Sequence, residues 1–281
     1  MPQHLRAVLW MLGTLISLSL MGLSARELSA VYDTAQILFV RNMVGFMVIL
    51  LIMLRQGVGI VRTQRVGMHA LRNFVHIIGV GSWFYGIALL PLAEVFVLES
   101  TLPIWVVLLA IPFLGERFTL ARGAAVALGF AGILIILRPG LEIIDPAALI
   151  VLVGAFGFAS ANVATKALTR TEGPLTILFW MFLLQLAASA VFAVPTIFVP
   201  PAAMWPWVAA VGLTGIAAHY CTARSLTLAD AGLVIPLHYL RVPLIAWLGW
   251  LLYDETVDIW LGIGALVIFI GTMITVRAGK K

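Results

Sequence analysis

Ionisable side chains interrupt several long apolar stretches of this sequence, where they have few neighbours able to solvate them. Arg72 and His76 lie four residues apart in one stretch, Glu99 lies in the next, and His238 and Arg241 lie in a later one. A charged group in hydrocarbon costs about 2.5–3.5 kcal/mol on insertion scales, so such residues usually face a polar interior. Cations, imidazoles and a carboxylate gathered there could hold a small charged molecule or exchange protons with it.

The stretch 68–90 carries its polar residues on one side. Arg72, His76, Gly79 and Trp83 recur at spacings of four, three and four, which places them on one face of a helix. This face could be a cavity wall where Arg72 or His76 meets a carboxylate and Trp83 stacks on an apolar ring. Alternatively, Arg72 lies about one turn from the end of the stretch, where it could snorkel to lipid phosphate or pair with another helix.

Glu99 allows two interpretations as well. It could exchange a proton or hold an ammonium group, or it could form a fixed ion pair with Arg41 or Arg241. Pro103, four residues later, removes a backbone hydrogen bond. The carbonyl that this frees could line a cavity, or the proline could simply kink the helix.

A second stretch interrupted by proline lies at residues 232–253. Aligning Pro103 with Pro243 places Glu99 opposite Tyr239, so each half of the chain supplies broken helix and polar side chains at a corresponding depth. Paired interruptions of this kind point to a binding site at the membrane midplane, where two repeats meet.

Further polar residues accompany these interruptions. His238 and Arg241, three residues apart, share a helical face and could either line the cavity or hydrogen-bond to neighbouring helices. The preceding stretch adds His219 and Tyr220, with the same two alternatives. It also contains Arg224, which could act as a gate or snorkel to the surface.

The sequence therefore yields two sets of candidate residues. The candidates for ligand binding are His76, Trp83, Tyr85, Glu99, Trp105, His219, Tyr220, His238, Tyr239 and Arg241. The candidates for gating or coupling are Arg72, Glu99 and Arg224. Because no His-Glu-x-x-His run, Gly-x-Ser-x-Gly elbow, Gly-Lys-Ser/Thr loop or Cys/His cluster occurs, we expect no catalytic residue, metal, cofactor or ATP coupling.

The elements that position these residues must be membrane helices. The composition is 63% hydrophobic and only 10% charged, with a mean hydropathy of +1.11, against about 25% charged residues in soluble proteins. Windows of about 20 apolar residues, the length that spans a bilayer, occur at 7–24, 34–54, 68–90, 92–114, 120–138, 146–167, 174–195, 205–227, 232–253 and 257–277. We therefore expect an all-α membrane protein with ten transmembrane helices and the lipid bilayer, not nucleic acid, as its partner.

The ten stretches divide into two similar sets of five. The run from Pro103 through Gly115-Glu116-Arg117 is echoed by the run from Pro243 through Asp254-Glu255. The first turn is basic and the second is acidic, which predicts that they face opposite sides of the membrane. Residues 1–140 and 141–281 are thus expected to form two inverted five-helix repeats.

The loop charges also give an orientation. If the amino terminus is cytoplasmic, 11 of the 17 Lys and Arg residues lie in inside segments and only two in outside segments. Cytoplasmic loops carry this excess of cations, so both termini are expected in the cytoplasm, with the first stretch kept as an uncleaved helix.

Several short motifs carry a resemblance to a known family. They are Phe39-Val40-Arg41-Asn42, Leu71-Arg72, the run from Ser82 to Ala88, Pro103 followed by Leu114-Gly115-Glu116-Arg117, and Pro236-Leu237-His238-Tyr239 followed by Asp254-Glu255. In order and spacing they resemble the drug/metabolite transporter superfamily, and within it the ten-helix EamA-type permeases, over nearly the whole chain. Members often have a carboxamide or acidic residue before the tyrosine of the last motif, where this chain has His238.

The resemblance implies a secondary transporter of small polar or amphipathic metabolites, acting by alternating access in the bacterial inner membrane. The mixed lining suggests an amino acid or a related compound, with export favoured by analogy and with possible coupling to protons or a counter-substrate. The protein could be a monomer or a homodimer. The alternatives are a carrier for another metabolite, such as a nucleoside-type compound, an intramembrane lipid-modifying enzyme that uses His76, His238 and Glu99, or a channel.

Overall fold

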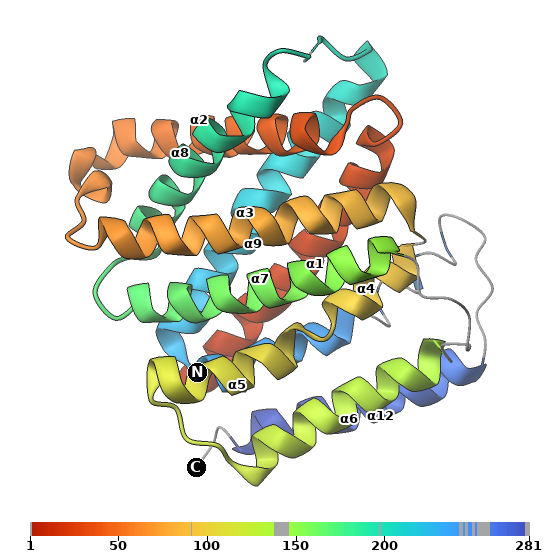
Figure 1. Cartoon of the computed structure of the whole chain (residues 1–281). Coiled ribbons are helices and arrows are strands. Elements are labelled where there is room, and N and C mark those ends of the chain that lie inside the picture. The colour runs from red at the N-terminus through yellow and green to blue at the C-terminus, as the bar shows by residue number, and fades with distance from the viewer. Residues whose placement is uncertain are drawn as a thin grey trace.

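Hydrocarbon offers no hydrogen-bond partner to the backbone, so long apolar runs must satisfy their own N–H and C=O groups as helices. The structure is a computed structural model that describes residues 2–90, 92–137, 146–196, 198–241, 244, 247, 248, 251 and 259–278. All regular structure in these residues is helical (Figure 1). Four of the described helices, α1, α2, α7 and α8, are individually long and apolar enough to cross a membrane.

The helices follow the predicted stretches. In the first half they are α1 (Gln3–Leu28), α2 (Thr34–Gln56), α3 (Val66–Leu89), α4 (Leu92–Glu99), α5 (Leu102–Leu114) and α6 (Leu120–Leu137). In the second half they are α7 (Pro146–Leu168), α8 (Pro174–Ala193), α9 (Trp205–Leu228), α10 (Ala231–Val234) and α12 (Ile259–Ala278). Short 3-10 helices are η1 (Val58–Val61), η2 (Ala202–Met204) and η3 (Ile235–Leu240).

Two of the ten stretches are not single α-helices, in agreement with the interruptions predicted from their prolines. The stretch 92–114 is divided into α4 and α5 at Ser100 and Thr101, immediately before Pro103. The stretch 232–253 starts as α10 and continues as the 3-10 helix η3, which contains Pro236. Both interruptions leave backbone groups outside the α-helical ladder inside the bundle.

Helix packing is two-fold symmetric in its pattern. The most extensive contacts are those of α1 with α9, α6 with α12, α3 with α7, and α2 with α8. Exchanging the halves converts the pair α1–α9 into the pair α7–α3 and leaves the pairs α2–α8 and α6–α12 unchanged. Figure 1 shows α6 and α12 side by side at one end of the bundle.

Equivalent helices of the two halves run antiparallel. Along α2 and α8, Gln36 donates to the Thr196 carbonyl at 2.9 Å, whereas Asn42 donates to the Ser189 hydroxyl at 3.4 Å. Residue numbers therefore increase along α2 in the direction in which they decrease along α8. In α6 and α12, Gly132 lies next to Gly264, whereas Gly271 lies next to Ala125, so these helices are antiparallel as well. This arrangement supports the predicted inverted repeat.

A matched pair of helix caps gives the register between the halves. At the end of α1, Arg26 donates to the Ile87 carbonyl of α3 at 2.6 Å. At the end of α7, Lys166 donates to the carbonyls of Leu226 and Ala229 at 2.8 and 2.7 Å. These cations, 140 residues apart, satisfy the free carbonyls at equivalent helix ends.

Three features used in the sequence predictions lie outside the described residues. They are Pro243, the boundary between residues 140 and 141, and the acidic turn Asp254-Glu255.

Close packing of α3 on α7 gives a stability prediction. A methyl group on Gly157 would lie 2.7 Å from the Val75 carbonyl oxygen, whereas one on Gly67 in α3 would have no atom within 4 Å. We expect Gly157→Ala to lower the free energy of unfolding by about 1–3 kcal/mol through overpacking. The control Gly67→Ala should be neutral or stabilise by up to about 1 kcal/mol. Equal thermal unfolding temperatures of the two detergent-solubilised variants would contradict this account of the interface.

Candidate functional site

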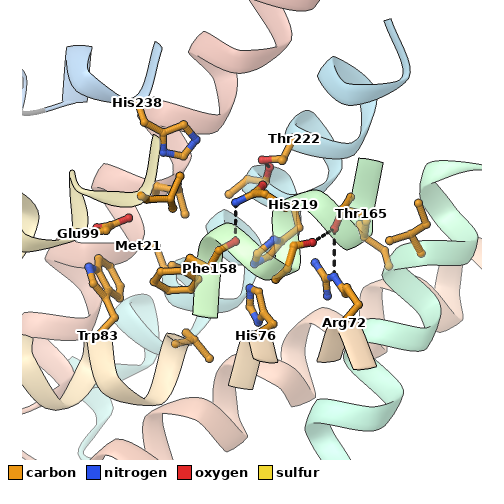
Figure 2. Close-up of a pocket in the computed structure, with 18 of the residues that line it drawn as sticks. Met21, Arg72, His76, Trp83, Glu99, Phe158, Thr165, His219, Thr222 and His238 are labelled. Carbon is orange, nitrogen blue, oxygen red and sulfur yellow. Dashed lines mark hydrogen bonds between the residues drawn. The ribbon is translucent and has the colours of Figure 1, made fainter. Parts of the chain in front are cut away.

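Both halves contribute to a cavity inside the bundle (Figure 2). Its volume is about 50 Å³, enough for a few water molecules, since one needs about 10–15 Å³ of such space. It is lined by Leu18, Met21, Arg72, His76, Val80, Trp83, Glu99, Leu102, Phe158, Ala161, Asn162, Thr165, Ile177, Leu178, Ala218, His219, Thr222, His238 and Arg241.

Seven of the candidate residues lie on the cavity wall, and five do not. Those on the wall are Arg72, His76, Trp83, Glu99, His219, His238 and Arg241. Those that do not line it are Tyr85, Trp105, Tyr220, Arg224 and Tyr239. In Figure 2, Glu99, Trp83 and His238 lie toward one end, and His76 and Arg72 toward the other.

Glu99 and Arg241 form an ion pair at the first of these ends. One guanidinium nitrogen, Nη1 of Arg241, donates to both Glu99 oxygens at 2.8 and 3.0 Å, and Nη2 donates to the Leu18 carbonyl at 3.1 Å. The guanidinium carbon also lies 4.3 Å from the ring centre of Phe96 and 5.4 Å from that of Trp83. Of the two alternatives for Glu99, the structure shows the fixed ion pair, in which Glu99 binds Arg241 rather than Arg41.

Arg72 lies inside the bundle, so the snorkelling interpretation is wrong. Its side chain is buried, Nε donates to the Thr165 hydroxyl at 3.2 Å, and Nη1 donates to the Asn73 side-chain oxygen at 3.1 Å. The helix pair α3–α7 places it on the cavity side, because Thr165 comes from α7. The position of Arg72 one turn from the end of its stretch indicated its depth in the membrane, but not that its side chain points into the bundle.

Arg41 is a fully buried cation behind the cavity wall. Its Nη2 lies 2.8 Å from Nε2 of His219, and its Nη1 donates to the Asn42 oxygen at 3.0 Å. Because a guanidinium can only donate, Nε2 of His219 must accept. His219 is therefore neutral, with its proton on Nδ1.

Gln185 of α8 joins this cation to α3. Its amide oxygen accepts from Arg41 at 3.5 Å, and its amide nitrogen donates to the Asn73 oxygen at 2.8 Å. The same nitrogen lies 3.0 Å from Nδ1 of His76, so that imidazole nitrogen accepts and the proton of a neutral His76 resides on Nε2. Nε2 of His76 is buried without a hydrogen-bond partner, as is Nε2 of His238.

Most of this network was not predicted from the sequence. Arg41 was expected only as a motif residue and a partner for Glu99, and no role was predicted for Asn73, Thr165 or Gln185. Carboxamide and hydroxyl groups within apolar stretches, which need partners in hydrocarbon, are the signal that could have found them.

Two aromatic candidates face outward. Tyr85 is 42% exposed, and Trp105 is 38% exposed and packs edge-on against Phe156 with ring centres 5.5 Å apart. Neither lines the cavity, because both lie on the outer faces of their helices. Their side chains are suited to lipid contact.

The other three candidates stabilise contacts between helices. Tyr239 is buried against α6 at Gly129, where a side chain would collide with its ring. Tyr220 packs edge-on against Trp10 at 5.7 Å, and the Arg224 guanidinium lies 5.6 Å from the Trp10 ring centre. Arg224 thus stacks on an indole between α9 and α1.

Two helical halves whose equivalent helices run antiparallel, with a cavity lined by both, form an arrangement typical of multi-pass membrane transporters. The chain belongs to the EamA-like transporter family, whose sequence profile matches residues 5–138 and again residues 145–277. Each half is thus one copy of the family's unit. The alternative of an intramembrane enzyme is wrong, and the protein is a secondary transporter of small-molecule metabolites.

The chain is similar to transporters with different cargoes. It is 32% identical to a riboflavin transporter of Rhizobium johnstonii over 277 residues, covering 96% of this chain and 90% of that one. It is 23% identical to an S-adenosylmethionine uptake transporter of Rickettsia prowazekii, covering 99% and 95%. It is 28% identical to a pseudopaline exporter of Pseudomonas aeruginosa, covering 93% of each. A solved crystal structure, 20% identical over 95% of each chain with a TM-score of 0.79, shares the fold.

The Glu99–Arg241 pair gives a second prediction. Glu99→Gln and Arg241→Gln each leave one buried charge without its partner, which costs about 3–5 kcal/mol in protein interiors. The double variant removes both charges, so we expect it to be more stable than the sum of the single effects implies. Thermal unfolding of the four proteins in detergent measures this coupling. Strictly additive losses would contradict the ion pair.

Proposed function

We propose that this protein carries a small amphipathic metabolite across the bacterial inner membrane by alternating access. The observation that carries the proposal is the cavity, which both halves line where their broken helices α4 and η3 are joined by Glu99 and Arg241. A fixed site between two repeats that rock against each other is the general design of such carriers.

Contacts between the halves at the proposed cytoplasmic side support a gate there. Gly115 ends α5 in a left-handed conformation with φ of 69°, which turns Glu116 toward the start of α10. Its carboxylate accepts from the backbone nitrogens of Ala231 and Gly232 at 2.9 and 3.1 Å. Arg122 then bridges Glu116 and Asp230 at 3.1 and 2.8 Å.

A second set of contacts at the same side involves Glu172, which follows α7. Its carboxylate lies 2.6 Å from Nε2 of His69 in α3 and accepts from the Thr63 hydroxyl. At the opposite side, the Tyr32 hydroxyl donates to the Phe198 carbonyl at 2.6 Å. We propose that these contacts form the two gates and that each set opens in turn during transport.

The substrate is proposed to contain a planar ring. Trp83 and Phe158 give the cavity aromatic walls, and one relative at 32% identity is a riboflavin transporter. Glu99 does not support the expectation of an amino acid substrate. Its carboxylate is paired with Arg241 and is not free to bind an ammonium group. Amino-acid export therefore has no specific support, and the relatives include both an uptake transporter and an exporter.

Transport by the purified protein in proteoliposomes tests this proposal. We expect saturable flux of a labelled ring-containing metabolite, with riboflavin and tryptophan as the first probes. Ala161→Phe, which places a ring in the cavity, should abolish flux, whereas Ala188→Phe on the exposed side of α8 should leave it within about twofold. Non-saturable flux would indicate a channel, and equal flux through both variants would exclude this cavity as the pathway.

The proposed orientation is tested by cysteine labelling. In a Cys221→Ser background, Arg62→Cys lies in the connection after η1 and Ala202→Cys lies in η2, on opposite sides of the proposed membrane. An impermeant maleimide should label residue 202 in intact spheroplasts and residue 62 only after lysis, because basic loops are retained in the cytoplasm. The reverse pattern would contradict cytoplasmic termini.

A further inference from the structure

The charges around the cavity do not balance among the described residues. Glu99 is neutralised by Arg241. Arg72, on the wall, and Arg41, directly behind it, are both buried, and neither has a carboxylate partner in the described part of the chain. Counted over the described residues, the site therefore carries a surplus of two positive charges.

Neutral groups hold both cations in place. Asn73 accepts from Arg72, and Gln185 connects Asn73 to Arg41 through its amide, while His219 accepts from Arg41 as a neutral imidazole. The network fixes the geometry of the cations without compensating their charge.

Uncompensated charges inside a membrane protein are costly and usually mark substrate pathways. Arg41 is enclosed, since a methyl group on Gly215 of α9 would lie 3.0 Å from its Nε. Arg72 instead lines the cavity. It lies next to His76, a neutral imidazole whose Nε2–H group is buried without a hydrogen-bond partner. An arginine and an unpaired N–H donor at one end of a cavity are suited to a carboxylate or phosphate.

We infer that the substrate is an organic anion, with its carboxylate or phosphate bound by Arg72 and Nε2 of His76 and its ring between Phe158 and Trp83. This inference rests on the proposed function and names the substrate class of that site. The surplus charge attracts an anion and repels a cation, so it selects against compounds with a net positive charge.

Matched ligand pairs test the charge requirement by binding to the purified protein. One pair is indole-3-propionate and indole-3-propionamide, and the other is riboflavin 5′-phosphate and riboflavin. Each pair shares a ring system and differs in the anionic group, so the two pairs separate carboxylate from phosphate recognition. We expect at least one anion to bind about tenfold more tightly than its neutral partner, which corresponds to about 1.4 kcal/mol.

Arg72→Gln should remove this preference, and Arg72→Lys should restore part of it. The control Arg62→Gln changes an exposed arginine outside the cavity and should leave the preference intact. Without ligand, Arg72→Gln should unfold at the same temperature as the parent protein or above it, because it removes an uncompensated charge. A purely structural Arg72 would instead give a less stable variant with equal losses for both members of a pair.

The outcomes distinguish this inference from the proposed function. Saturable flux of neutral or cationic metabolites that is unchanged in Arg72→Gln would overturn the anion site. The proposed transport function would still hold. Equal or absent binding of all four ligands would overturn the anion site as well. Absence of saturable flux for every anionic, neutral and cationic metabolite tested would overturn both.

Discussion

A carboxylate and a guanidinium that meet inside the bundle, Glu99 and Arg241, connect the two places where regular helix is interrupted. Each charge would be costly alone in an apolar interior, and each compensates the other at 2.8 Å. Because Glu99 ends α4 and Arg241 follows η3, the pair joins the two halves where their backbones leave the α-helical ladder. The cavity extends from this junction to Arg72 and Thr165, where α3 packs on α7.

The two halves share a fold, but the side chains at equivalent positions differ in charge and polarity. With the 140-residue register given by Arg26 and Lys166, Arg72 corresponds to Gly212 and His76 to Ile216. At these two positions α3 carries a cation and an imidazole where α9 has a glycine and an isoleucine, and the polar groups that α9 brings to the cavity, His219 and Thr222, lie further along the helix. The packing of the two halves is thus symmetric, whereas the side chains that they bring to the cavity are not.

Much of this architecture could be predicted from the sequence. The apolar stretches, the interruptions near Pro103 and Pro236, and the shared face of Arg72, His76 and Trp83 follow from local composition and helical period. The outward position of Tyr85 could not be predicted in the same way, because an aromatic side chain suits both a binding wall and a lipid face. Gln185 gave little signal because an uncharged amide barely changes hydropathy.

By itself, then, the sequence determined the elements, their repeat and the stretches that carry polar groups, because insertion into hydrocarbon depends on local runs of residues and on loop charge. Only the tertiary structure decided which polar groups are partners. Glu99 could have paired with Arg41 or Arg241, and contact at 2.8 Å exists for Arg241 alone. Such choices depend on positions that are more than a hundred residues apart in the chain, and helix packing, not periodicity, brings those positions together.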